Sequence, residues 1–163
     1  SRDCPEFDIE LPGGRRIVVI PNPFKSKRTG DDQASQDRRR AQAERAHQIC
    51  MSALSRSDLV LLGGDLNDTP ASAPLASLFT DGFEDISTHP AYPTQRPGTF
   101  GTGLKTQKID YLITSQDLRA HLVGVGLERR GSYHPALWQP FDTVKKSADD
   151  ASDHHLVWAD FDL

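Results

Sequence analysis

The sequence predicts an α/β domain, and three stretches of the chain carry this prediction. Residues 59–62 are an uninterrupted apolar run closed by two glycines, which is typical of a short strand buried on both faces of a sheet. Residues 35–56 contain no glycine or proline and repeat apolar side chains at helical spacing, which favours an amphipathic helix packed on a sheet. Residues 156–161 are interpreted as a strand with alternating faces. A length of 163 residues with 36% hydrophobic side chains is enough for one domain with a sizeable core.

Turn residues and periodicity predict the remaining elements. Residues 6–20 indicate a β-hairpin, because alternating apolar positions lead into a Pro-Gly-Gly turn and a buried strand returns afterwards. A short helix is expected over 72–80, where a serine stands at the cap and a proline in the first turn. The other expected elements are two strands, over 107–114 and 121–128, and two long loops rich in turn residues, over 87–106 and 129–151.

Charge and composition narrow the class of protein. The formal net charge of -4 argues against a protein that coats nucleic acids, because such proteins usually present a basic surface. Residues 24–40 are nevertheless basic, with six lysines and arginines against three aspartates, and a basic loop beside a catalytic site would attract phosphate. A solvated helix start explains the arginines at 38–40 equally well. No apolar run approaches the roughly 18 residues of a membrane-spanning helix. The two cysteines, Cys4 and Cys50, leave the compartment undecided.

A carboxylate and an amide directly follow the apolar run at 59–62. Asp65 and Asn67 are two positions apart, and such a pair at the mouth of a buried strand can orient a water molecule, accept its proton or hold a phosphate oxygen. The same residues are good turn formers, so an Asx turn explains them about equally well. This stretch alone leaves both interpretations open.

Three short motifs each lie beside an expected strand: Gly-Asp-Leu-Asn at 64–67, Ile-Asp-Tyr at 109–111 and Ser-Asp-His at 152–154. Together and in this order they resemble the endonuclease/exonuclease/phosphatase superfamily of metal-dependent phosphoesterases. The resemblance implies a DNase I-like fold, in which this chain would form part of a four-layer α/β/β/α sandwich. Residues 22–27, Asn-Pro-Phe-Lys-Ser-Lys, are similar to an Asn-His-Phe-Lys-Ser-Lys segment of a bacterial, often secreted, nuclease-like branch. That branch suggests a secreted or periplasmic location.

The resemblance also implies roles for four catalytic residues. Asp65 would align or deprotonate the attacking water, and Asn67 would hold that water or a phosphate oxygen. His154 would donate a hydrogen bond or a proton to the phosphate. Asp110 would accept a hydrogen bond from the other ring nitrogen of His154 and so fix its tautomer.

Metal and phosphate ligands are implied in the same way. Asp153 would bind a divalent metal, and Mg²⁺ suits oxygen ligands without a cysteine partner best, with Mn²⁺ or Ca²⁺ as other choices. Asn22, Lys25 and Lys27 would bind the phosphate of the substrate. His155 is expected at the surface, because the family motif requires only the first of the two histidines.

Two departures from the family pattern affect the expected activity. Pro23 stands where the branch has a histidine, and no counterpart of the family's metal-binding glutamate precedes Asp65. Residues 1–163 are therefore expected to be the later part of one domain whose N-terminal part lies outside this chain. The expected partners are that missing part or a second copy of the chain, together with a nucleic acid as substrate.

Three functions remain open. The first is a metal-dependent phosphodiester hydrolase, most simply a nuclease that cleaves DNA or RNA by attack of an activated water molecule, and the Lys-Ser-Lys segment favours it. The second is a phosphatase or phospholipase of the same fold, acting on a phosphoinositide, sphingomyelin or a small phosphomonoester. The third is a binding domain that has kept the fold and lost the chemistry.

Overall fold

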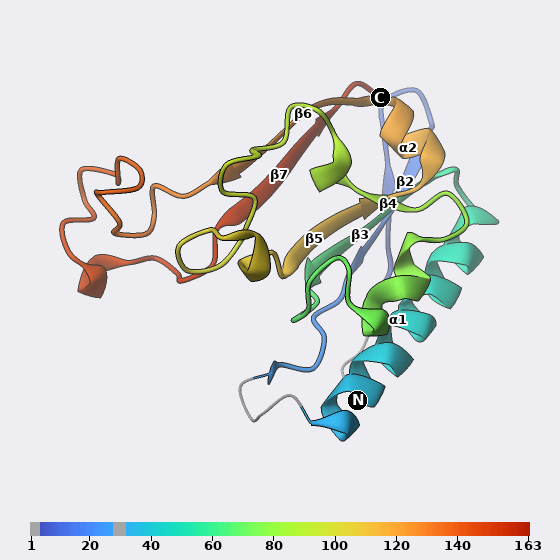
Figure 1. Ribbon diagram of the computed structural model, residues 1–163. Helices are drawn as coiled ribbons and strands as arrows, with labels where there is room; N and C mark the ends of the chain where they lie inside the picture. Colours follow the sequence, from blue (N-terminus) through green and yellow to red (C-terminus); the bar gives the residue numbers. More distant parts are fainter. Residues whose placement is uncertain (1–3, 28–31) are drawn as a thin grey trace.

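The computed structural model describes residues 4–27 and 32–163, which form two β-sheets and the helices that cover them (Figure 1). Five strands form the first sheet, in the order β1-β2-β3-β5-β4, and β6 and β7 form the second. The strands are β1 (Phe7–Glu10), β2 (Arg16–Pro21), β3 (Leu59–Asp65), β4 (Glu84–Asp85), β5 (Asp110–Thr114), β6 (Leu122–Glu128) and β7 (Leu156–Phe161). The helices are α1 (Gln33–Leu54), α2 (Gln116–Ala120) and the 3-10 helices η2 (Ala73–Phe79), η3 (Ile86–Thr88), η4 (Lys105–Gln107) and η5 (Ser147–Asp149).

The helix α1 covers one face of the five-stranded sheet. Alanines at its buried positions let it approach the strands closely, and the strands contribute β-branched and leucine side chains to the same core. The helix begins two residues before the expected position because the Asp32 side chain accepts a hydrogen bond from the backbone N–H of Ser35, at 2.8 Å, and so caps its first turn. The core between α1 and the sheet is formed mainly by Val18, Ile20, Ala43, Ala46, Ala53, Val60, Leu62 and Ile113.

The second sheet lies on the opposite side of the first sheet from α1 (Figure 1). Leu112 of β5 packs there against the inner side chains of β6 and β7, including Leu127 and Val157. The described chain thus has three layers, α/β/β, which confirms the predicted mixed α/β fold. Within the described residues, no helix is both long and apolar enough to span a membrane.

The two predicted long loops differ in how they lie on this framework. The segment at 87–106 folds back against the start of β7, where the backbone of Phe100 pairs with that of His154 and the N–H of His155 donates to the carbonyl of Thr99 at 2.7 Å. The segment at 129–151 extends away from both sheets, as the orange-red trace at the left of Figure 1 shows. The first loop therefore contributes directly to the region around His154.

Candidate active site

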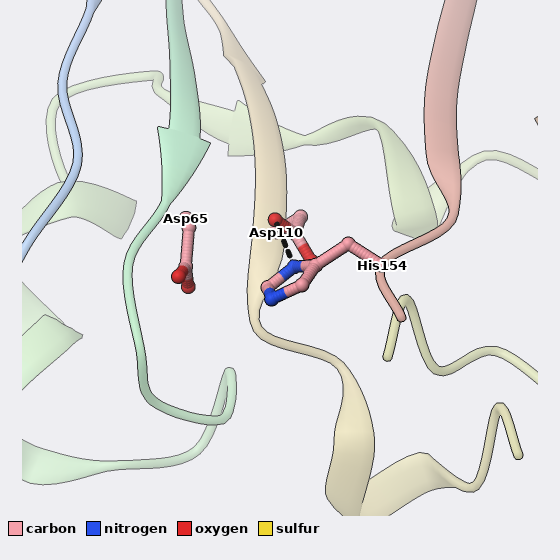
Figure 2. Close-up of side chains that lie close together, drawn as sticks. All are labelled: Asp65, Asp110 and His154. Atoms are coloured by element: carbon pink, nitrogen blue, oxygen red, sulfur yellow. Dashed lines mark hydrogen bonds and ion pairs between the residues drawn. The ribbon is translucent and has the colours of Figure 1, made fainter. Parts of the chain in front are cut away.

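Backbone pairing brings the two predicted carboxylates together. The strands β3 and β5 are antiparallel, and Asp65, the last residue of β3, is the register partner of Asp110, the first residue of β5. Directly paired residues of neighbouring strands point to the same face of a sheet, so both carboxylates lie on the side of the second sheet. His154, just before β7, reaches the same place (Figure 2). The expected strand over 107–114 begins only at Asp110, which is why this residue lies at the edge of the sheet.

The His154 ring is held by Asp110. Its Nδ1 lies 3.0 Å from both carboxylate oxygens of Asp110, and the Thr99 hydroxyl donates to one of these oxygens at 2.6 Å. The Phe100 ring packs edge-on against the imidazole, with 5.1 Å between the ring centroids. Because a carboxylate can only accept, Nδ1 carries the proton, and Nε2 lies on the side of the ring that faces Asp65 (Figure 2).

Asp65 and Asn67 form the Asx turn that their sequence permits. The Asn67 backbone N–H donates to one carboxylate oxygen of Asp65 at 2.9 Å, and its side-chain amide donates to the other at 2.7 Å. Asn67 adopts a positive φ of 54°, a conformation that asparagine tolerates better than most residues. The turn fixes the orientation of the Asp65 carboxylate. The Asx turn and the carboxylate–amide pair at the mouth of the strand are therefore one and the same arrangement.

Burial, and then the charge of Asp110, raise the pKa of the Asp65 carboxyl above its ordinary value, against the hydrogen bonds from Asn67 that lower it. Two carboxylates this close repel each other, and a cation between them would relieve the repulsion. Asp65, Asp110 and His154 each offer one ligand atom, and these atoms lie within 4.8 Å of one another. Two of these three atoms are carboxylate oxygens, which suit a divalent cation that prefers oxygen ligands.

Asp153 does not belong to that group. It is exposed, and its backbone carbonyl accepts a hydrogen bond from the N–H of Gly101 at 2.9 Å, which ties the loop at 87–106 to the segment before β7. Its assignment as a metal ligand stays a prediction.

The three predicted phosphate ligands lie on the segment after β2, which runs beside Asp65, because the N–H of Phe24 donates to the Asp65 carbonyl at 2.8 Å. Asn22 is buried, with 5% of its surface exposed, and its amide nitrogen lies 3.0 Å from the Cys4 sulfur. Asn22 and Lys25 line a cavity beside α1, whereas Lys27 pairs with Asp68 at 2.7 Å. Their role as phosphate ligands stays a prediction. Arg28 of the same basic segment lies outside the described residues.

A buried charge network behind the site was not predicted. Asp68 accepts hydrogen bonds from Arg39 Nε at 3.0 Å and from Lys27 Nζ, and its backbone carbonyl accepts one from the Tyr111 hydroxyl at 2.7 Å. Arg39 is fully buried, so the prediction that it belongs to a solvated helix start is wrong. The sequence did indicate that Arg39 is buried, because Arg39 shares helical spacing with Ala43 and Ala46 on the buried side of α1.

The prediction that His155 is a surface residue is also wrong. Only 4% of its surface is exposed, because the loop at 129–151 returns over it and the Trp138 ring packs edge-on against the imidazole at 5.1 Å. Its Nε2 lies 3.1 Å from the Gly101 carbonyl, and burial lowers its pKa to about 4. His155 therefore acts as a neutral residue of the core beside the site.

Gly64 determines how closely β2 and β3 approach beside Asp65. Its φ is 152°, and a Cβ there would lie 2.5 Å from the carbonyl oxygen of Asn22. We expect Gly64→Ala to lower the free energy of unfolding by about 2 kcal/mol, since the strands must separate. Gly63→Ala is the matched control, because its Cβ would meet the flexible end of the Leu112 side chain at 3.0 Å and the Tyr111 carbonyl oxygen at an ordinary contact distance of 3.6 Å. Urea unfolding of both variants measures the difference, and equal losses would contradict this explanation.

The fold and the group at its edge define a phosphoesterase fold of the DNase I-like kind. The model of the Endonuclease/Exonuclease/phosphatase family matches residues 4–154, and the chain belongs to this family. The motif-based prediction of the family is thus confirmed, whereas the nuclease-like branch within it stays a prediction. No curated protein sequence matches the chain significantly.

Solved structures agree on the fold. Beta toxin from Staphylococcus aureus superposes with a TM-score of 0.66 and 17% sequence identity, over 96% of this chain and 56% of the toxin chain. Truncated TDP2 from Caenorhabditis elegans gives 0.61 and 19%, over 94% and 57% of the two chains. A variant of the 3' phosphatase NExo from Neisseria, bound to a product DNA hairpin, gives 0.58 and 18%, over 97% and 65%. The chain therefore spans between half and two thirds of the length of these proteins.

Proposed function

We propose that this domain is a metal-dependent phosphodiester hydrolase that cleaves a nucleic acid by attack of an activated water molecule. The observation that carries the proposal is the meeting of Asp65, Asp110 and His154 at one edge of two packed sheets. A base, an oriented imidazole and a pair of carboxylates for a cation meet the requirements of phosphodiester hydrolysis.

Each residue has a role that follows from its contacts. The Asp65 carboxylate, held by two N–H groups of Asn67, is placed to orient the attacking water and accept its proton. Asp110 holds the proton on Nδ1 of His154 and so orients the ring, and when the ring is protonated on both nitrogens its Nε2–H would donate to a phosphate oxygen. Asp65 and Asp110 are the residues that would hold a divalent cation, most simply Mg²⁺, with Mn²⁺ or Ca²⁺ as other choices. When bound, the cation supplies positive charge against the phosphate oxygens.

A nucleic acid is the substrate that the remaining observations favour. Lys25 and the exposed arginines of α1 add positive charge near the end of β2 in an otherwise acidic chain. One solved structure of the same fold is bound to DNA. A small phosphoester or a phospholipid is the second candidate, since a mannosyl-6-phosphatase from Bacteroides thetaiotaomicron has the same fold. Pro23 favours the third candidate, a binding domain, because its side chain can neither donate nor accept a hydrogen bond.

The experiment is a substrate panel with metal control. The purified protein is incubated with single-stranded and double-stranded DNA, RNA, a phosphomonoester and sphingomyelin vesicles, each with Mg²⁺, Mn²⁺, Ca²⁺ or EDTA. We expect cleavage of nucleic acid that EDTA abolishes. Hydrolysis of only the phosphomonoester or the sphingomyelin would favour a phosphatase or phospholipase instead of a nuclease. Tight binding without hydrolysis under every condition would favour a binding domain.

We further propose that the outer face of β1 is a contact surface between copies when this chain is on its own. Phe7 and Ile9 point from this edge strand with 53% and 46% of their surfaces exposed, beside Val19 of β2. Exposed apolar side chains on an edge strand favour association. We expect light scattering to show a dimer, and the double variant Phe7→Lys with Ile9→Lys to be monomeric. A monomer without these substitutions would contradict the proposal.

A further inference from the structure

An open cavity of about 640 Å³ lies beside α1, and none of its lining residues belongs to the group at Asp65. The segment after β2 contributes Asn22 and Lys25 to its wall, and α1 contributes Arg38, Gln42 and Arg45. The proposed hydrolysis gives these cations only a general attraction for nucleic acid, and a specific role for them rests on that proposal.

The wall of the cavity is strongly basic. Among the described residues that line it, three carry a positive charge and none is acidic. The nearest capping carboxylate, that of Asp32, responds to this charge: hydrogen bonds from Ser35 lower its pKa most, and the positive charges of Lys25 and Arg38 lower it further. Three cations around one cavity give a positive potential that attracts an anion.

Hydrogen bonds fix the backbone of the segment after β2 in this wall before any ligand binds. The backbone N–H of Lys25 donates to Gln42 Oε1 at 2.8 Å, which joins the segment after β2 to the middle of α1. Phe24, between the two lining residues of that segment, is fully buried in the core, and its N–H donates to the Asp65 carbonyl at 2.8 Å. A preformed wall reduces the conformational entropy lost on binding.

The size and chemistry of the cavity indicate its ligand. Its volume lies within the roughly 300–1,000 Å³ typical of small-molecule sites, which is far more than a single inorganic ion requires. Arginine side chains match the geometry of phosphate oxygens, and a nearby amide and lysine add further hydrogen-bond donors. We infer that this cavity binds the phosphate of a nucleotide-sized ligand through Lys25, Arg38 and Arg45. The nucleotide is either free or the end of a nucleic-acid strand.

Binding is measured in EDTA, so that no hydrolysis takes part. Calorimetry with a 5'-mononucleotide and with a six-nucleotide DNA strand that carries a 5'-phosphate separates the two sources of the ligand. We expect the double variant Arg38→Gln with Arg45→Gln to bind the better probe at least about tenfold more weakly, since each hydrogen bond to a charged group contributes substantially. Arg40→Gln is the matched control, because Arg40 is exposed on the same helix, pairs with Asp37 and does not line the cavity.

Each outcome decides the inference. Mononucleotide binding that the double variant weakens identifies a free nucleotide, and binding of the strand alone identifies a strand end. Binding of neither probe, or equal weakening by Arg40→Gln, overturns the inference. Both arginines of the double variant are exposed, so its melting temperature should match that of the control.

Discussion

Asp65→Asn is expected to lower metal-dependent hydrolysis by at least about 10²- to 10⁴-fold, the range typical for loss of a general base. The amide can neither accept the proton of the attacking water nor offer a charged ligand to a cation. In EDTA the melting temperature should change little, because the loss of one of the two hydrogen bonds from Asn67 offsets the removal of a half-buried charge. The raised pKa of Asp65 means that its charged form destabilises the fold, and this cost is present above the folded-state pKa and absent below the unfolded one. At neutral pH the substitution removes that cost.

His154→Ala tests the same assignment from the other side of the site. We expect a loss of activity of similar size with the fold retained, because a third of this side chain is exposed. Asp142→Asn, an exposed aspartate in the loop at 129–151, is the control for a lost negative charge. Initial rates at saturating Mg²⁺ measure the activity, and thermal unfolding measures the stability. If Asp65→Asn or His154→Ala has an activity within a few-fold of that of the unmodified protein, the role proposed for that residue is excluded.

Asp68→Asn should cause the largest loss of stability, about 3 kcal/mol or more in the free energy of unfolding. Arg39 has no exposed side-chain surface and Asp68 only 6%, so the substitution leaves a buried guanidinium beside a neutral amide. Removing one partner of a buried ion pair costs far more than removing an exposed one, because the remaining buried charge loses the attraction of an ionised neighbour that water cannot replace. The loss should appear as a lower urea midpoint.

Asp37→Asn is the control for that measurement, because it breaks an exposed pair with Arg40 and should change stability by less than about 1 kcal/mol. Lys27 provides a further comparison, since its side chain is 39% exposed and Lys27→Met should cost much less than Asp68→Asn. Equal urea midpoints for Asp68→Asn and Asp37→Asn would show that Arg39 does not depend on this carboxylate.

Local patterns in the sequence were sufficient for the framework. The glycine-closed run at 59–62 became β3, the helical spacing at 35–56 became α1, and the hairpin at 6–20 formed as expected. The contact between Asp110 and His154 was also expected, although 44 residues separate them, because two motifs implied it. These features follow from periodicity or from motifs, both of which are local properties of the chain.

The differences arise where contacts between distant segments decide the environment of a side chain. His155 was assigned to the surface by its neighbours in the chain, but Trp138 covers it. Arg39 is charged, yet the partner that makes its burial acceptable, Asp68, lies 29 residues away. Asn22 follows a strand that ends near Asp65, but its side chain contacts Cys4 instead of the site. Such contacts depend on the packing of the whole chain and leave little local signal.

Asp65 and Asp110 face each other as paired residues of β3 and β5, and this pairing determines which parts of the domain can change without loss of the site. Their separation is set by backbone pairing between two neighbouring strands of the five-stranded sheet and does not depend on the connection at 129–151. That connection could therefore be exchanged, lengthened or grafted from another protein while the carboxylate geometry stays the same, whereas the connection at 87–106 has to keep Thr99, whose hydroxyl holds Asp110. A slip of one residue between β3 and β5, in contrast, would turn one of the two carboxylates toward α1 and end the chemistry at once.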